Sequence, residues 1–172
     1  MKFLGIDPGY ARMGYGLIEV TGNRAAFVDA GVCETSPKQK EGERLAHMQK
    51  FLQQLLKSHS ITHAALEQVF LRKDLTTGIR LSEARGVIVM NLFLAGISYS
   101  EISPSAMKKS ITGSGSAQKK TVQLMTAKLL NLPAQMKIDD AADGLGLAFC
   151  AWLRWQAGQI RIQSRRKNNA PN

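Results

Sequence analysis

The hydrophobic positions at the start of the chain form three runs separated by turn residues. Apolar residues gather at 3–6, 14–20 and 25–33. The segment 21–23, Thr-Gly-Asn, has a composition typical of a tight turn between two strands. Short connections of this kind join neighbouring strands in antiparallel order. The pattern therefore predicts three strands in an antiparallel meander.

Downstream of the meander, helical and strand-like segments alternate. Apolar positions spaced by three and four residues predict helices, and these segments are 43–57, 81–91, 104–109 and 119–130. Two further apolar runs, 64–70 and 99–103, predict strands. We therefore expect an α/β fold in which a mixed five-stranded sheet, an antiparallel meander followed by parallel strands, is flanked by helices.

The pattern also predicts where the long helix begins and which face of the helix over 119–130 is buried. The polar and basic segment 72–78 predicts a loop before the long helix. In the helix over 119–130, the side chains expected to face inwards are Val122, Met125, Leu129 and Leu130.

Two of the predicted strands end in a carboxylate. Asp7 follows the apolar run 3–6 and precedes a Pro-Gly turn, and Glu67 follows the apolar residues 64–66. A carboxylate at the end of a buried strand is unfavourable unless a positive charge meets it. An Asp that only hydrogen-bonds its own turn is the alternative for Asp7. Because neighbouring strands converge at one sheet end, we expect the two acids to meet there.

The last predicted helix, 139–152, begins with three aspartates. Asp139, Asp140 and Asp143 are spaced so that either of the first two shares a helix face with the third. Acids in a first helical turn also act as caps, so one of Asp139 and Asp140 caps the helix and the other is available for chemistry. Small residues after Asp143 allow close approach to a sheet.

Asp7, Glu67 and the aspartate pair would bring four carboxylates together. Four such groups cannot all ionise unless cations neutralise them. Hard oxygen ligands favour Mg²⁺ or Mn²⁺. Two such ions about 4 Å apart form a site for in-line attack of water on a phosphodiester.

Positive charge is clustered in the chain. The 23 Lys and Arg residues exceed the 13 Asp and Glu residues and give a net charge of +10. The segments 104–120 and 154–167 carry much of this charge and contain no acid. This clustering is typical of proteins that bind a phosphate backbone, and we favour that interpretation over a solvated basic face or a basic tail that only aids solubility. Phe70 fits either base stacking or core packing.

Composition limits the cellular compartments in which the protein could work. No apolar run approaches the roughly 18 residues of a membrane-spanning helix, and the first residues do not resemble a signal peptide. Cys33 and Cys150 lack metal-ligand spacing and fit small core residues in a reduced, cytoplasmic protein. We predict one domain over residues 1–156 and a basic, flexible tail over 157–172.

The ordered set of motifs resembles the RuvC family of Holliday-junction resolvases, which are bacterial endonucleases of the RNase H-like fold. The matching segments are Gly5–Gly9 with Gly14–Gly16, Glu67–Phe70, Ala84–Val87, Lys108 with Gly113–Ala117 and Lys119, and Asp140–Asp143. The resemblance covers about residues 2–155 in order. Asp139 duplicates the acid of the closing motif, so the choice of Asp140 depends on the family spacing.

The resemblance implies a Mg²⁺-dependent homodimer that resolves four-way DNA junctions by symmetric paired nicks and cooperates with RuvA and RuvB in recombination and repair. It implies that Asp7 bridges two Mg²⁺ ions, with Mn²⁺ as a substitute, while Glu67, Asp140 and Asp143 complete the coordination. Lys119, and after it Lys108, would position the scissile backbone or stabilise developing charge. The DNA-binding residues would be Phe70, Arg72, Lys73, Arg85, Lys108, Lys109, Lys119 and Lys120.

Three other functions are compatible with parts of the pattern. Another RNase H-like nuclease, of the RNA–DNA hybrid or transposase type, would use the same acids. A non-catalytic junction-binding protein would not require all four. A sugar-kinase or actin-like ATPase also has a glycine-flanked Asp on its first strand, but 172 residues leave no room for its second phosphate-binding half.

Overall fold

The computed structural model describes residues 1–69, 74–132 and 142–168, with side chains described up to residue 159. Its centre is a five-stranded sheet in the order β3-β2-β1-β4-β5. The strands are β1 (Lys2–Asp7), β2 (Arg12–Thr21), β3 (Arg24–Glu34), β4 (Ile61–Glu67) and β5 (Ser98–Ile102). The first three pair antiparallel, whereas β4 pairs parallel with both β1 and β5. The predicted meander followed by parallel strands is confirmed.

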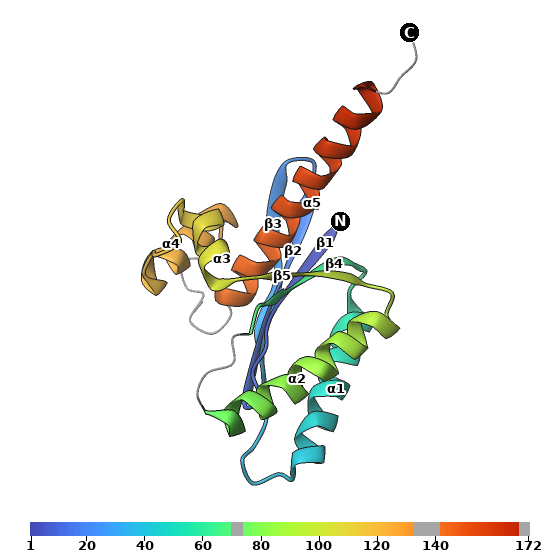
Figure 1. Ribbon diagram of the computed structural model, residues 1–172, viewed down its shortest axis with the longest axis vertical. Helices are drawn as coiled ribbons and strands as arrows, with labels where there is room; N and C mark the ends of the chain where they lie inside the picture. Colours follow the sequence, from blue (N-terminus) through green and yellow to red (C-terminus); the bar gives the residue numbers. More distant parts are fainter. Residues whose placement is uncertain (70–73, 133–141, 169–172) are drawn as a thin grey trace.

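Helices cover both faces of the sheet (Figure 1). They are α1 (Glu41–Ser58), α2 (Leu75–Leu94), α3 (Pro104–Thr112), α4 (Lys119–Leu129) and α5 (Ala142–Asn168). Helices α1 and α2 lie together on one face, and α5 lies on the other face with α3 and α4 beside it. None of the described helices is long and apolar enough to cross a membrane.

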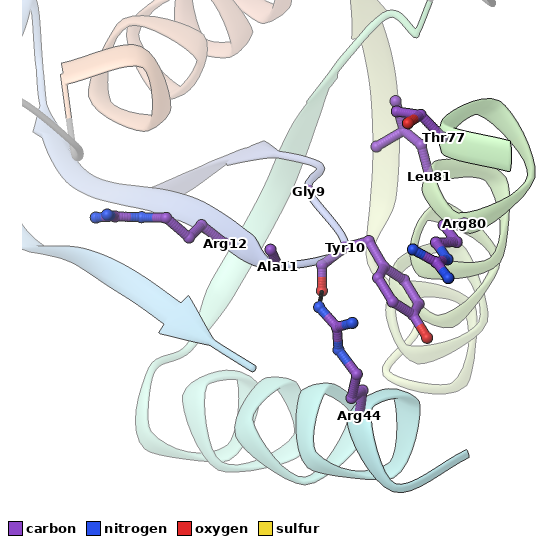
Figure 2. Close-up of a pocket in the computed structure, with 8 residues that line it drawn as sticks. All are labelled: Gly9, Tyr10, Ala11, Arg12, Arg44, Thr77, Arg80 and Leu81. Carbon is purple, nitrogen blue, oxygen red and sulfur yellow. Dashed lines mark hydrogen bonds between the residues drawn. The ribbon is translucent and has the colours of Figure 1, made fainter. Parts of the chain in front are cut away.

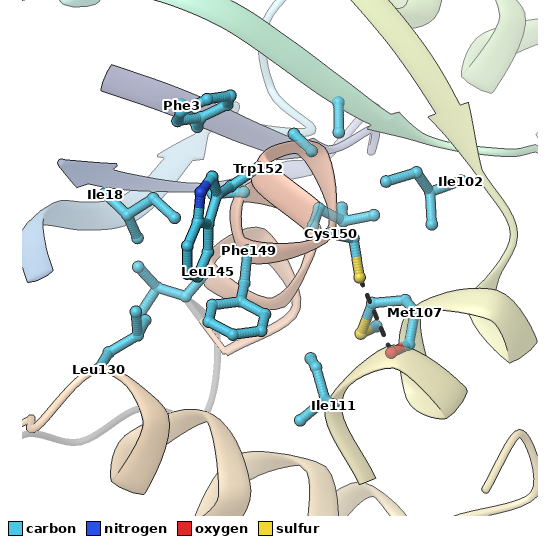
Figure 3. Close-up of a cluster of buried hydrophobic side chains, with 14 of the residues drawn as sticks. Phe3, Ile18, Ile102, Met107, Ile111, Leu130, Leu145, Phe149, Cys150 and Trp152 are labelled. Atoms are coloured by element: carbon cyan, nitrogen blue, oxygen red, sulfur yellow. Dashed lines mark hydrogen bonds between the residues drawn. The ribbon is translucent and has the colours of Figure 1, made fainter. Parts of the chain in front are cut away.

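Alternation along the strands creates two cores. Phe3 on β1 packs on the α5 side with residues such as Leu145 and Trp152, which Figure 3 shows around α5. Its neighbour Leu4 packs on the opposite side with α1 and α2. Successive residues of a strand point to opposite faces, so β1 contributes to both cores. A strand buried on both faces reads as a continuous apolar run, as β1 does.

The cysteines are part of these cores. Cys33 and Cys150 are buried and free, as predicted. The Cys150 thiol donates to the carbonyl oxygen of Met107 at 3.9 Å, which ties α5 to α3 (Figure 3).

Glycines let α5 approach the sheet closely. A Cβ atom on Gly144 would lie 2.4 Å from the Tyr15 carbonyl carbon and 2.5 Å from the Gly16 nitrogen. A Cβ on Gly5 would lie 2.0 Å from the Gly144 oxygen. Since Gly5 and Gly16 are paired across β1 and β2, the first turn of α5 rests directly on backbone. The expectation that small residues permit this approach is confirmed.

Two details of the predicted helices are wrong. Helix α2 begins at Leu75, inside the segment 72–78 whose composition predicts a loop, because the Asp74 side chain accepts from the Thr76 and Thr77 amides and caps it. Leu129 is 38% exposed, because the buried face of α4 runs through Val122 and Thr126 to Leu130, and Leu129 lies beside this face.

The last helix is longer than the sequence pattern indicates. Helix α5 continues past Gln156 to Asn168, so the backbone of the predicted tail is helical up to that residue. Figure 1 shows this part of α5 extending past the sheet. The boundary at 156 and the flexibility of the tail stay predictions, and residues 169–172 lie outside the described chain.

Candidate active site

Two carboxylates meet at one end of the sheet. Ile6 pairs with Leu66 across the parallel strands β1 and β4, so the next residues, Asp7 and Glu67, stand side by side. Their side chains are hydrogen-bonded to each other. Because a carboxylate oxygen cannot donate, this bond requires a proton on one of the two groups. The predicted convergence of these acids is therefore present.

Burial and mutual repulsion make this pair reluctant to ionise. Burial, followed by the negative charge of Asp7, raises the pKa of Glu67 to about 8. Burial also raises the pKa of Asp7, an effect that its hydrogen bond with Glu67 opposes. The two groups titrate as a unit. At neutral pH and without a cation, the pair therefore retains one proton.

Asp143 supplies a third negative charge from the first turn of α5. Its charge raises the pKa values of both Asp7 and Glu67. The close approach of Gly144 to β2 brings the start of α5 to this end of the sheet. Within the described residues, however, no group of three His, Cys, Asp or Glu side chains is spaced closely enough to hold a metal ion. Asp143 therefore acts on the pair through its field.

Two lysines border the carboxylates. The Lys119 Nζ atom lies 3.8 Å from the Asp143 Oδ2 atom, and its charge lowers the pKa of Asp7. The charge of Lys108 lowers the pKa of Glu67. Lys119 begins α4, and Lys108 lies within α3. The Lys119 side chain is 63% exposed, so it can reach a bound ligand.

The other predicted site residues are not all brought to this place. Arg85, on α2, forms an ion pair with Glu101 of β5. Lys109 and Lys120 are exposed on α3 and α4. Those that lie outside the described residues are Phe70, Arg72, Lys73, Asp139 and Asp140.

The structure also places together residues that the sequence pattern does not single out. Tyr10, Arg44 and Arg80 come from three separate elements and line one cavity. A second group, on α2 and β5, exposes large apolar side chains. A signal for this second group exists in the sequence, because apolar residues occupy more than one face of α2.

Comparisons with known proteins identify the family of the chain. The family model described as crossover junction endodeoxyribonuclease RuvC matches residues 3–151. Proteins named crossover junction endodeoxyribonuclease RuvC from Heliobacterium modesticaldum and Thermosipho melanesiensis are each 40% identical over 150 residues. The matched region covers 87% of this chain and 93% and 96% of those proteins, respectively.

Solved structures have the same fold. The Thermus thermophilus RuvC structure superposes with a TM-score of 0.84 at 26% identity, covering 92% of this chain and 97% of that one. The same protein in complex with a Holliday junction substrate gives a TM-score of 0.83 at 26% identity and covers 91% and 96% of the two chains. The yeast mitochondrial Holliday junction resolvase Ydc2, at 15% identity and a TM-score of 0.65, shares the fold. The chain belongs to the RuvC family of crossover junction endodeoxyribonucleases.

Proposed function

We propose that this protein resolves four-way DNA junctions by hydrolysing one phosphodiester in each of two opposed strands. The observation that carries the proposal is the meeting of Asp7 and Glu67 beside the charge of Asp143, with Lys108 and Lys119 at the border. The acids offer a place for cations, and the lysines offer a place for a phosphate. The junction as substrate comes from family membership, since a related RuvC has been solved with a Holliday junction.

The type of donor atom fits hard divalent cations, although the three described carboxylates are not grouped closely enough to hold one by themselves. Asp7, Glu67 and Asp143 contribute only carboxylate oxygens, which are the ligands that Mg²⁺ and Mn²⁺ prefer. The raised pKa values of Asp7 and Glu67 show that, without a cation, the negative charges at this site repel one another. We assign the fourth carboxylate to Asp140 and expect two Mg²⁺ ions. When bound, the ions supply charge neutralisation and lower the pKa of water to the range where it attacks phosphorus.

The chain's own residues prepare the site for this chemistry. The proton between Asp7 and Glu67 must leave before both can act as ligands. Lys119 holds Asp143 in place until a phosphate enters and can then turn its ammonium group towards that phosphate. Lys108 provides a second positive charge on the Glu67 side. These lysines therefore orient the scissile group and stabilise developing negative charge.

Replacing Lys119 with Gln separates this role from general attraction of DNA. We expect the cleavage rate on bound junction to fall about 100-fold, because the variant lacks one preorganised charge. Junction affinity should fall only slightly. Single-turnover cleavage at saturating protein measures the first quantity, and equilibrium binding without divalent metal measures the second.

Lys128→Gln is the matched control, because it removes the same charge from the exposed last turn of the same helix. About 14 Å of helix separates the two lysines. Equal cleavage rates for the Lys119 and Lys128 variants would remove Lys119 from the active site.

The remaining basic residues complete the proposed DNA surface. Lys109 and Lys120 are exposed beside Lys108 and Lys119, and we assign them to the phosphate backbone. Phe70 is assigned to base stacking at the opened crossover. Arg72 and Lys73 follow it in sequence and are assigned to the same strand. Arg85 is less suited to binding DNA because it is paired with Glu101.

We also propose that the protein acts as a homodimer through the exposed apolar surface of α2 and β5. Phe93 is 80% exposed, Ile79 is 51% exposed and Met90 is 42% exposed. A cavity of about 640 Å³ is lined by Met90, Phe93 and Tyr99 of this surface, among others. A second copy fits because two symmetric cuts require two equivalent active sites. By family resemblance, the dimer works in the cytoplasm with RuvA and RuvB.

Replacing Phe93 with Glu should dissociate this dimer. Burying a carboxylate in the apolar interface should weaken self-association at least about 100-fold. Light scattering across a concentration series measures the change. Leu124→Glu is the control, because Leu124 is 57% exposed on α4, away from this surface. A Phe93 variant that dimerises like the Leu124 variant would place the interface elsewhere.

Substrate selectivity tests the function as a whole. A mobile synthetic four-way junction, a linear duplex of the same sequence and an RNA–DNA hybrid are incubated with the protein and Mg²⁺. The proposal predicts paired nicks at symmetric positions in the junction and little cleavage of the other two. Preferred cleavage of the hybrid would indicate a ribonuclease H activity instead. Tight junction binding without cleavage under Mg²⁺ or Mn²⁺ would indicate a non-catalytic binding protein.

A further inference from the structure

A cavity rich in arginine lies next to the turn that follows Asp7. Its volume is about 460 Å³, and Gly9 and Tyr10 of the turn line one side together with Arg12, which begins β2. Arg44 of α1 and Arg80 of α2 line the others (Figure 2). Two helices that are separate in the sequence thus bring guanidinium groups to the Tyr10 ring, whereas the Arg12 side chain points away from it (Figure 2). Among its described lining residues there is no Asp or Glu.

Arg44 holds this side of the molecule together. Its Nε atom donates to the Thr35 hydroxyl at 2.9 Å, and its Nη2 atom donates to the Tyr10 carbonyl oxygen at 3.4 Å. The Thr35 hydroxyl donates to the same carbonyl at 2.7 Å. The guanidinium carbon also lies 4.1 Å from the centre of the Tyr10 ring. Arg44 is therefore a fixed charge beside the cavity.

Among the residues that the structure describes, no acid is paired with the charge of Arg44. Arg44 is only 9% exposed, and no carboxylate among the described residues forms an ion pair with it. Its partners are two neutral oxygens and an aromatic ring, which compensate a buried cation only in part. A buried positive charge at the edge of a cavity favours an anionic ligand there.

Arg80 adds an adaptable charge on the far side of Tyr10. Its guanidinium carbon lies 5.8 Å from the ring centre, and Figure 2 shows the ring between the two arginines. Arg80 is exposed, and the acids near enough to feel its charge are Asp74 and Glu83. Both lie outside the cavity lining. Arg80 can therefore turn towards a ligand without breaking the fold.

Arg12 is already engaged. Its Nη2 atom lies 3.3 Å from the Glu34 Oε1 atom. Glu34 therefore offsets its charge, and Arg44 and Arg80 provide the ligand-binding groups of the cavity.

The position of the cavity connects it with the carboxylates. Gly9 follows Asp7 by two residues, so their Cα atoms are about 7.6 Å apart at most. Asp7 faces α5 by strand alternation, whereas Tyr10 packs on the side of α1 and α2. The turn after β1 is the edge shared by both sites. Successive phosphates of one DNA strand are spaced about 3.4 Å apart along the helix axis. A phosphate one or a few nucleotides from the scissile phosphate can therefore reach the cavity while the scissile phosphate lies at Asp7.

We propose that this cavity binds a backbone phosphate of the DNA strand a few nucleotides from the bond that is cut, with Arg44 and Arg80 as its ligands. This inference rests on the proposed function. The planar guanidinium fork suits a phosphate because it offers two parallel N–H donors. A phosphate held on this side of the turn fixes the strand on the face opposite Asp143. It thereby sets the register in which the scissile phosphate meets the carboxylates.

Arg80→Gln tests the proposed phosphate site without disturbing Arg44. Junction binding is measured over a salt series in metal-free buffer. The expected result is affinity that is about threefold to tenfold weaker. The slope of log affinity against log salt should fall in magnitude by about 0.9, because the variant neutralises one phosphate fewer than the wild type.

Lys57→Gln is the matched control. It removes one exposed positive charge from the last turn of α1, about 20 Å along that helix from Arg44. Its affinity and salt slope should equal those of the wild type. Identical behaviour of the Arg80 and Lys57 variants would overturn the proposal.

A neutral methylphosphonate, placed at one junction phosphate at a time, locates the bound phosphate. At one position near the cut, the methylphosphonate should weaken junction binding by the wild type but not by the Arg80→Gln variant. The absence of any such position would overturn the proposal.

A last experiment measures whether inorganic phosphate raises the melting temperature of the wild type and of the Arg80→Gln variant. If phosphate stabilises only the wild type while Arg80→Gln binds junctions as tightly as the wild type does, the cavity binds a small anion and not DNA, and the proposal is overturned. If the wild type binds and cuts junctions and Arg80→Gln has the same junction affinity and salt slope, only the proposed phosphate site is refuted. Wild-type protein that binds no junction would refute the proposed function and, with it, this inference.

Discussion

Replacing Asp7 with Asn should abolish junction cleavage while junction binding persists. Asn has the same shape but lacks the negative charge that a divalent cation requires at this strand end. The substitution also removes one of the charges that raise the pKa of Glu67. We expect the cleavage rate to fall at least about 1,000-fold, since removal of a catalytic group commonly has effects of this size.

The fold should tolerate the Asp7 substitution. A buried acid whose pKa is raised by burial and by the charge of Asp143 does little to stabilise the protein. The melting temperature of the Asn variant should therefore be equal to or higher than that of the wild type. A lower melting temperature would mean that Asp7 serves the turn and not the chemistry.

Glu19→Gln is the control for this experiment. Glu19 is exposed on β2 and pairs in register with Lys2, at the opposite end of β1 from Asp7. The Glu19 variant should cleave like the wild type. Retained cleavage by the Asp7 variant would contradict the assignment of the active site.

Replacing Gly144 with Ala should separate α5 from the sheet. The new methyl group would lie within 2.4 to 2.8 Å of the Tyr15 and Gly16 backbone, where no flexible side chain can move away. Overpacking of this kind costs about 1–3 kcal/mol of unfolding free energy. Urea unfolding measures the decrease.

The Gly144 substitution should also reduce activity beyond its effect on stability. Asp143 precedes Gly144, so a shift of the first turn of α5 moves this carboxylate away from Asp7. Cleavage at a temperature where the variant is fully folded should fall by an order of magnitude or more, given that about 1 Å of misplacement can cost 100-fold.

The same helix supplies a control. Gly158 of α5 has open space where its Cβ would be. Ala has a higher helix propensity than Gly, so Gly158→Ala should stabilise the protein by up to about 1 kcal/mol. If Gly144→Ala behaved in the same way, the close approach of α5 would not position the site.

Much of the fold can be predicted because its pattern is local. Strand β1 is a continuous apolar run that ends in Asp7, and the turn at 21–23 marks the meander without any knowledge of the tertiary structure. The start of α2 is harder to predict, because the polar composition of 72–78 indicates a loop, whereas the segment Asp74-Leu75-Thr76-Thr77 provides a helix cap. The structure shows that the cap determines where the helix begins.

The features that cannot be predicted depend on distant residues. Arg44 has the sequence signature of a surface residue, yet its partners Tyr10 and Thr35 bury it. The family motif assigns Arg85 to DNA, whereas Glu101, 16 residues away, pairs with it. Charge counts reveal how many basic residues exist but not which of them the fold neutralises.

The most direct test of the central claim is anomalous scattering from Mn²⁺ in crystals of the wild-type protein. The account predicts Mn²⁺ density between Asp7 and Glu67, near Asp143, and no such density in the Asp7→Asn variant. Mn²⁺ density only elsewhere on the molecule, in a protein that cleaves junctions with Mn²⁺, would contradict the account.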